Sequence, residues 1–139
     1  SFLLSALKDP TGANLDRIQV VKGWVDAHGV AHEKVFNVAW SAPRQRKQVK
    51  GRLPAVGDTV DLATATYTNT IGVPALNTVW RDPEFKPRSR AFYYARVLEI
   101  PTPRWTLYDA VRFKVKPPEG ATLKAQERAY TSPIWYKPG

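Results

Sequence analysis

The chain has 139 residues, of which 43% are hydrophobic and 24% are charged; this length and composition fit one globular domain and exclude a disordered chain. It contains no cysteine, which excludes disulfides, thiolate metal sites and cysteine nucleophiles. The net charge is +9 at pH 7, which indicates either an anionic partner or a basic surface without one. No segment approaches the roughly 18 consecutive apolar residues of a membrane span.

The first predicted element is a short apolar strand at Phe2–Leu7, which ends in the turn sequence of Asp9–Gly12. The chain contains no methionine and opens directly in this apolar run, which is too short for a signal peptide. We therefore expect residues 1–139 to be a piece of a longer chain, either processed or cut.

A β-hairpin is predicted to follow. Leu15–Val25 has the composition and alternation of a strand, and Val30–Trp40 is the return strand. Asp26–Gly29 forms the turn between them, because Gly29 can adopt the positive φ angle that tight turns require.

Ser41–Gly57 is predicted to be a loop, because prolines and glycines punctuate it. The candidate anion contacts of the chain lie here: Arg44, Arg46, Lys47, Lys50 and Arg52. Two interpretations stay open, a solvated surface loop and an anion-binding site. The segment RQRKQVKGR has no aromatic side chain on which a base can stack, which disfavours nucleic acid as the partner.

The middle of the chain is predicted to hold one strand and one irregular region. Asp58–Asn69 alternates well and is rich in β-branched residues, so it is predicted to be a strand. Ile71–Arg90 is rich in turn residues. Within it, Pro74–Trp80 is expected to form at most a single helical turn, with proline in its first turn.

Ala91–Ile100 is the best candidate for a central strand. Large apolar side chains lie on both of its faces, which is typical of a strand that is covered on both sides. Pro101 and Pro103 are predicted to stop this strand, because neither can donate a hydrogen bond to a neighbour.

Arg96 shares a face with apolar side chains of this strand, and a buried arginine is costly unless it is paired. The expected partner of Arg96 is a carboxylate such as that of Asp109 or Glu127. The alternative is that this face of the strand meets another domain.

Thr106–Phe113 is predicted to be a short helix or an irregular strand. Just before it, Arg104 and Trp105 place a cation beside an indole. Either Trp105 fills the edge of the core and Arg104 is solvated, or both residues, together with Tyr108, contact another domain or a ligand.

Lys124–Tyr136 is the last predicted strand, and Pro133 confines it to a sheet edge or a bulge. Short strands separated by turns, with little helix, predict a mainly β fold. We expect an antiparallel β-sandwich of about six to seven strands with long irregular loops. No internal boundary divides the chain, so residues 1–139 are predicted to be a single domain.

Residues that carry catalytic or metal chemistry are scarce. His28 and His32 are the only imidazoles; His28 lies in the predicted hairpin turn and His32 follows it, whereas a zinc site needs three or four ligands. The serines lie in no GxSxG-type elbow, and no glycine-rich phosphate loop is present. We expect no catalytic residue, metal site or cofactor in this chain.

Several segments resemble the carboxy-terminal part of a bacterial family, the domain-of-unknown-function family three-six-zero-four. The segments are DRIQVVKGW from Asp16, HEKVFNVAWS from His32, DLATATYTNTIG from Asp61, AFYYARVLEIPTPRWTLYDAVRF from Ala91 and ERAYTSPIWY from Glu127. The resemblance implies that the parent protein is longer and exported, hence periplasmic or secreted. It also implies an amino-terminal domain similar to PHP-type metallohydrolases, with HxH-containing motifs that hold a divalent metal.

Two functions follow from these expectations. The first is a non-catalytic carboxy-terminal β domain that packs against the amino-terminal domain of the same protein and shapes its cleft. The alternative is a stand-alone binding module for an anionic or polysaccharide ligand. In the second case the basic loop contacts the glycan, and the tryptophans are the stacking platforms: Trp24, Trp40, Trp80, Trp105 and Trp135.

Overall fold

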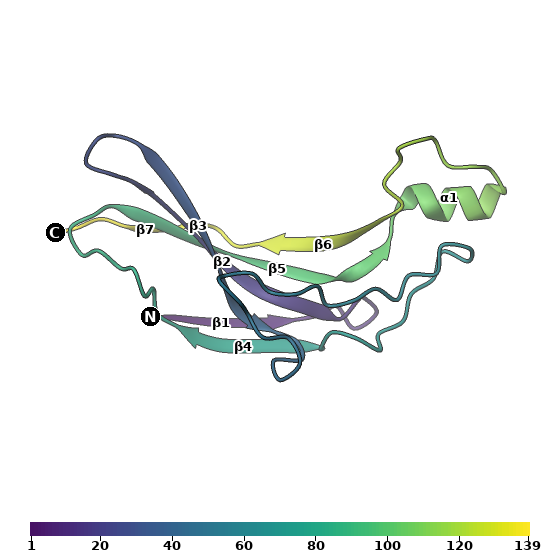
Figure 1. Ribbon diagram of the computed structural model, residues 1–139, viewed down its shortest axis with the longest axis horizontal. Helices are drawn as coiled ribbons and strands as arrows, with labels where there is room; N and C mark the ends of the chain where they lie inside the picture. The colour runs from purple at the N-terminus through teal and green to yellow at the C-terminus, as the bar shows by residue number, and fades with distance from the viewer.

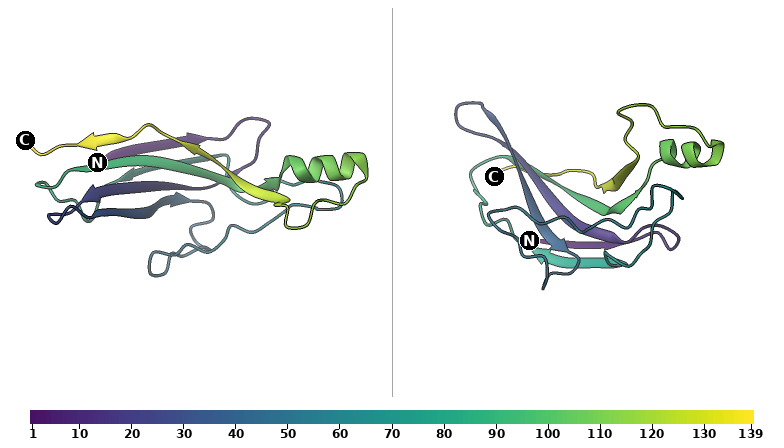
Figure 2. Two further views of the ribbon diagram at one scale, coloured as in Figure 1. Left: turned by 90° about the horizontal axis from the view of Figure 1, so that it is seen from above. Right: turned by 45° about the vertical axis from the view of Figure 1, so that its right-hand side comes forward.

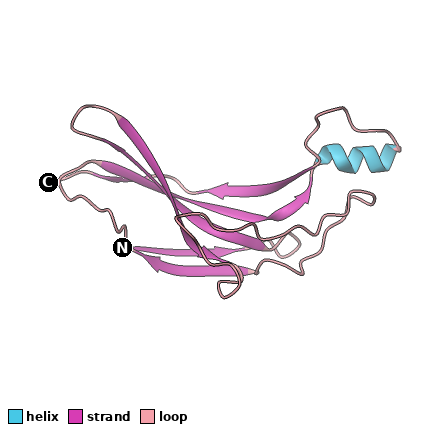
Figure 3. Cartoon of the chain, in the orientation of Figure 1, coloured by secondary structure: helices cyan, strands magenta, loops and turns pink.

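The computed structural model describes residues 1–139, which form seven strands in two antiparallel sheets and one helix (Figures 1 and 3). The main sheet has the order β3 (Ala31–Trp40), β2 (Leu15–Val25), β5 (Ala91–Pro103) and β6 (Lys124–Tyr130), and β7 (Ile134–Tyr136) also pairs with β5. The small sheet pairs β1 (Phe2–Leu7) with β4 (Ala75–Trp80), and the helix is α1 (Trp105–Phe113). The predicted mainly β class is confirmed. No helix has the length and apolar composition of a membrane span.

The hairpin of β2 and β3 forms as predicted. The backbone N–H of Gly29 donates to the carbonyl of Asp26 at 3.1 Å, and Gly29 adopts a φ of 80°. The Asp26 carboxylate also accepts hydrogen bonds from the backbone N–H groups of His28 and Val30. These contacts are local, which is why the sequence pattern was sufficient to predict the turn.

The core lies between the small sheet and one face of the main sheet. Ile18 and Val20 of β2 and Tyr93 of β5 are at most 4% exposed, and Phe2 and Leu4 of β1 pack against this part of the sheet. Since successive strand residues point to opposite faces, the residues that alternate with these on β2 and β5 point away from the small sheet.

The prediction that both faces of Ala91–Ile100 are covered is wrong. The small sheet lies on one side of the main sheet only, and no second layer lies on the other, here called the free face (Figures 1 and 2). The β2–β3 hairpin and α1 rise at opposite ends on that side, which makes the free face concave.

Two secondary-structure predictions in the middle of the chain are also wrong. Asp58–Asn69 is a loop that holds only an isolated bridge between Asp61 and Thr66, because the Asp61 carboxylate caps the N–H of Ala63 and Ala65 turns the chain with a φ of 53°. Conversely, Pro74–Trp80 is not a helical turn. Its residues from Ala75 onward form β4, because β1 pairs with them along their whole length.

The central strand β5 runs beyond its predicted end. Pro101 and Pro103 still pair with β6, after a register shift that follows Leu98. They are tolerated because the paired part of β2 begins at Leu15, opposite Glu99, so the last residues of β5 have a neighbour on one side only. The last predicted strand is divided into β6 and β7 by the residues up to Pro133, and both strands lie at the sheet edge as expected.

Candidate functional site

The free face of the main sheet carries a cluster of aromatic side chains, here called the aromatic platform: Phe92, Tyr94, Tyr130 and Trp135. The rings of Phe92 and Tyr94 are parallel to within 8°, with centroids 6.4 Å apart. Trp135 lies 5.2 Å from Phe92, and Tyr130 lies 6.3 Å from Tyr94. Trp135 is 73% exposed and Tyr130 is 57% exposed, so the platform is accessible from solvent.

Gly23 of β2 is what lets Phe92 lean across the sheet. It is the cross-strand neighbour of Phe92, and a Cβ atom at Gly23 would lie 2.3 Å from the Cζ atom of that ring. No side chain fits there while the ring keeps this position. The glycine therefore determines how the platform sits on the sheet.

A row of hydrogen-bonded side chains crosses the free face next to the aromatic platform; we call it the polar row. Arg96 Nε donates to Gln19 Oε1 at 2.8 Å, and Gln19 Nε2 donates to Asn37 Oδ1 at 2.8 Å. The prediction that a carboxylate such as that of Asp109 or Glu127 pairs with Arg96 is wrong, because Arg96 forms no ion pair. Gln19 partners it instead, since β2 lies directly beside β5.

Tyr130 joins the aromatic platform to the polar row. It is the cross-strand neighbour of Arg96, and Arg128 precedes it by two residues on the same face of β6. The nearby guanidinium groups of Arg128 and Arg96 lower the pKa of the Tyr130 hydroxyl, and Arg128 has the larger effect. These cations therefore lie beside the phenol oxygen at the end of the platform.

A groove of about 1030 Å³ opens where the platform meets the hairpin, here called the end groove. Its aromatic walls are Trp24, Phe92, Trp135 and Tyr136. His32 stacks on Trp24 with centroids 5.2 Å apart, and its Nε2 lies 2.7 Å from the carboxylate of Asp26. This hydrogen bond is the main reason that the pKa of Asp26 is lowered. No group of three or more possible metal ligands lies together in the structure.

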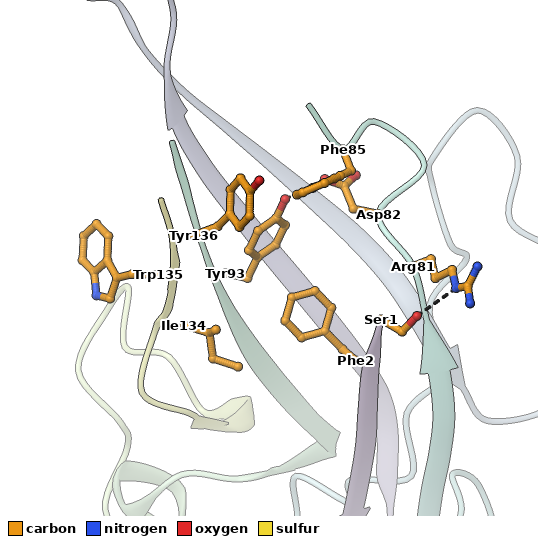
Figure 4. Close-up of a pocket in the computed structure, with 9 residues that line it drawn as sticks. All are labelled: Ser1, Phe2, Arg81, Asp82, Phe85, Tyr93, Ile134, Trp135 and Tyr136. Atoms are coloured by element: carbon orange, nitrogen blue, oxygen red, sulfur yellow. Dashed lines mark hydrogen bonds between the residues drawn. The ribbon is translucent and has the colours of Figure 1, made fainter. Parts of the chain in front are cut away.

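A smaller hollow of about 460 Å³ lies on the opposite, core-facing side (Figure 4). Trp135 projects away from it on the other side of β7, whereas Tyr93 and Tyr136 point into it. Asp82 accepts hydrogen bonds there from Lys22 Nζ at 2.5 Å and from the Tyr93 hydroxyl at 2.8 Å. Burial and this carboxylate raise the pKa of Tyr93. The polar groups of Lys22, Asp82 and Tyr93 are hydrogen-bonded to one another, so we assign this cluster a structural role.

The five cations of the basic loop do not all face solvent. Arg46 is 7% exposed, and its Nη2 lies 2.7 Å from a carboxylate oxygen of the fully buried Asp16. Arg17 pairs with the other oxygen of Asp16 at 2.8 Å. The prediction that Arg46 contacts an anionic ligand is therefore wrong, because its guanidinium is buried and paired inside the domain. The other cations of the loop are exposed: Arg44, Lys47, Lys50 and Arg52.

The exposed apolar side chains of α1 and the turn after it form a second accessible surface, here called the helix surface: Trp105, Tyr108, Val111, Phe113 and Val115. Trp105 is 66% exposed, so the interpretation that it fills the edge of the core is wrong. Tyr108 lies three residues after Trp105, and Val111 lies three residues after Tyr108, so each is about one helical turn from the one before it. Arg104, at the start of the helix, is half-buried.

Two of the five tryptophans, Trp40 and Trp80, are unavailable as platforms. Trp80 packs on Phe2 and Phe36 beside the core, and Trp40 donates through Nε1 to the Arg46 carbonyl. Only Trp105 and Trp135 are more than half exposed. Sequence reasoning missed Phe92, Tyr94 and Tyr130 as a site. The alternation along β5 already places Phe92 and Tyr94 on the same face, but Tyr130 comes to lie beside them only through the pairing of β6 with β5.

Comparison with protein families gives one match. A family model described as "Protein of unknown function (DUF3604)" matches residues 1–138. Comparisons with curated proteins and with solved structures give no match.

Proposed function

The chain belongs to the DUF3604 family of proteins of unknown function, and on that premise we propose that it is a non-catalytic β domain that docks onto another domain of the same protein. The sequence resemblance supports an amino-terminal metallohydrolase-like domain as the partner, in an exported protein. In this proposal the divalent metal belongs to that domain. The β domain buttresses it and shapes its cleft.

The helix surface is the observation that carries this proposal. Trp105 and Phe113 are 66% and 64% exposed, and Val115 beside them is 58% exposed. Large apolar side chains gathered in one place mark interaction surfaces, and buried tryptophans dominate the energy of many interfaces. The inner side of α1 is already satisfied by burial of Leu107 and Ala110, so the outer stripe contributes nothing to this domain's own core.

The construction of α1 keeps this surface in place. The backbone N–H of Val115 donates to the Ala110 carbonyl at 3.0 Å, and Lys114 closes the helix in a left-handed conformation with a φ of 55°. The helix lies at the end of the molecule away from both termini (Figure 1). It therefore presents its apolar stripe at a projecting end, which suits insertion against a second folded unit.

The test compares the natural gene product with the isolated chain. Amide hydrogen exchange of residues 105–115 should slow markedly in the natural product, because docking covers α1. Trp105→Ala in the natural product should restore fast exchange there, whereas Trp135→Ala, which removes an equally exposed tryptophan from the free face, should not. Equal exchange in the isolated chain and the natural product, or a natural product with the mass of this chain alone, would contradict the proposal.

A second candidate function is favoured by the aromatic platform and polar row. These features suit a binding module for an anionic or polysaccharide ligand. This second function uses a different surface from α1.

A further inference from the structure

The free face combines flat apolar rings with fixed polar groups on a concave surface. Phe92 and Tyr94 present parallel rings, and Trp135 extends the platform to the sheet edge. Sugar rings stack on such aromatic side chains through their C–H faces, while their hydroxyl groups need hydrogen-bond partners close by. Arg96 and Asn37 of the polar row are partly exposed and supply those partners beside the rings, while the buried Gln19 between them holds both in place.

The polar row is held in a fixed geometry before any ligand arrives. Gln19 accepts from Arg96 and donates to Asn37, whose own amide nitrogen donates to the Gly51 carbonyl at 3.3 Å. The Arg96 guanidinium is thereby held through its Nε. Neither it nor the neighbouring Arg128 is neutralised by an ion pair, so these cations remain available to an anionic group.

The charges differ between the two ends of the platform. The end near Arg96 and Arg128 is cationic. The end groove carries carboxylates as well as cations: Asp26, Glu33, Arg90 and Lys137. A polynucleotide has a phosphate at every unit and would place one beside these carboxylates. A chain with spaced negative charges and many hydroxyl groups fits both ends, because hydroxyl groups donate to carboxylates.

We propose that the free face binds an acidic polysaccharide in which acidic and neutral sugar units alternate. Sugar rings stack on Phe92, Tyr94 and Trp135, and a carboxylate or sulfate of the glycan pairs with Arg96 and Arg128. Phe92 and Arg96 are separated by roughly 13 Å along β5, which calls for an extended chain of several units and not a single sugar. The site does not overlap the helix surface, so it stands or falls independently of the docking proposal.

The experiment is calorimetric titration of the chain with hyaluronan and with chondroitin sulfate oligosaccharides at low salt, with dextran as the uncharged control. Binding of either acidic glycan, weakened by added salt, is expected. Trp135→Ala and Arg96→Ala should each weaken it about tenfold, the effect of losing one stacking or charge-assisted contact. Far-UV circular dichroism confirms that each variant is folded.

Matched controls locate the site. Trp105→Ala removes an exposed tryptophan from α1, and Lys47→Ala removes one positive charge from the basic loop; neither should change the affinity by more than about twofold. Loss of binding in Lys47→Ala equal to that in Arg96→Ala would overturn the assignment, as would an unchanged affinity in Trp135→Ala. Failure of both glycans to bind, or binding of an oligothymidylate alone, would overturn the ligand class.

Discussion

Replacement of Arg46 by alanine should destabilise the domain strongly, although the residue lies in a loop whose sequence reads as solvated. Its guanidinium pairs with the fully buried Asp16 at 2.7 Å and donates to the Ser41 hydroxyl at 2.9 Å and to the Pro54 carbonyl at 2.8 Å. Removal of one partner of a buried ion pair costs about 3–5 kcal/mol, because the other charge stays buried.

The remaining partners of Asp16 set where in that range the cost falls. Arg17 still pairs with one carboxylate oxygen at 2.8 Å, and Gln126 donates to the same oxygen at 2.9 Å. We therefore expect the low end, about 3 kcal/mol in the free energy of unfolding. For a domain of this size that corresponds to a fall of about 10 °C in the midpoint of thermal unfolding.

Urea denaturation of the wild type, Arg46→Ala and Lys47→Ala measures this difference. Lys47 is exposed, so its replacement should change the free energy of unfolding by no more than about 0.5 kcal/mol. Arg46→Lys should fall between the two, because lysine keeps the charge and loses the planar fork. The reasoning would be refuted if Arg46→Ala proved as stable as Lys47→Ala.

Two further predictions concern the free face and the buried carboxylate behind it. Gly23→Ala should lower the free energy of unfolding, measured by urea denaturation, by roughly 1–3 kcal/mol, because the new Cβ would lie 2.3 Å from the Phe92 ring. The same loss of stability in a Phe92→Ala background would contradict this explanation. Burial alone raises the pKa of Asp82, but hydrogen bonds from Lys22 and Tyr93 outweigh it and leave the pKa lowered. The resulting stabilisation is present above the unfolded pKa of about 3.9 and is lost as the pH falls through the folded pKa. Asp82→Asn should be the less stable protein near neutral pH, and its deficit should shrink in acid; a deficit independent of pH would contradict the assignment.

Local patterns were enough for the hairpin and for the helix. The turn at Asp26–Gly29 is made by groups a few residues apart, and α1 ends at Lys114 through bonds to its own last turn. Alternation alone misled at Asp58–Asn69. The same alternation of residue types suits a strand, but no neighbouring strand is present to pair with it, and short-range carboxylate hydrogen bonds fold it into turns.

The β4 strand shows the opposite case. Pro74–Trp80 has no strong local preference for helix or strand, yet its residues from Ala75 onward are extended because they pair with β1 along its whole length. The same holds for the candidate site. The parity of Phe92, Tyr94 and Arg96 along β5 was readable, whereas the positions of Tyr130 and Trp135 beside them depend on the registers of β6 and β7. Register follows from packing and turn geometry across the fold, which no short window of sequence contains.

The sequence alone therefore specifies the mainly β class, the β2–β3 hairpin and which side chains of β5 share a face, because alternation, β-branching and turn chemistry act between residues that are close along the chain. Which face stays open, and which cation of the basic loop is buried, depend on contacts between distant segments. Asp16 and Gln126, for example, are hydrogen-bonded across 110 residues of sequence. Such contacts form only when the sheets assemble, so the accessible aromatic platform and the buried role of Arg46 are properties of the assembled fold.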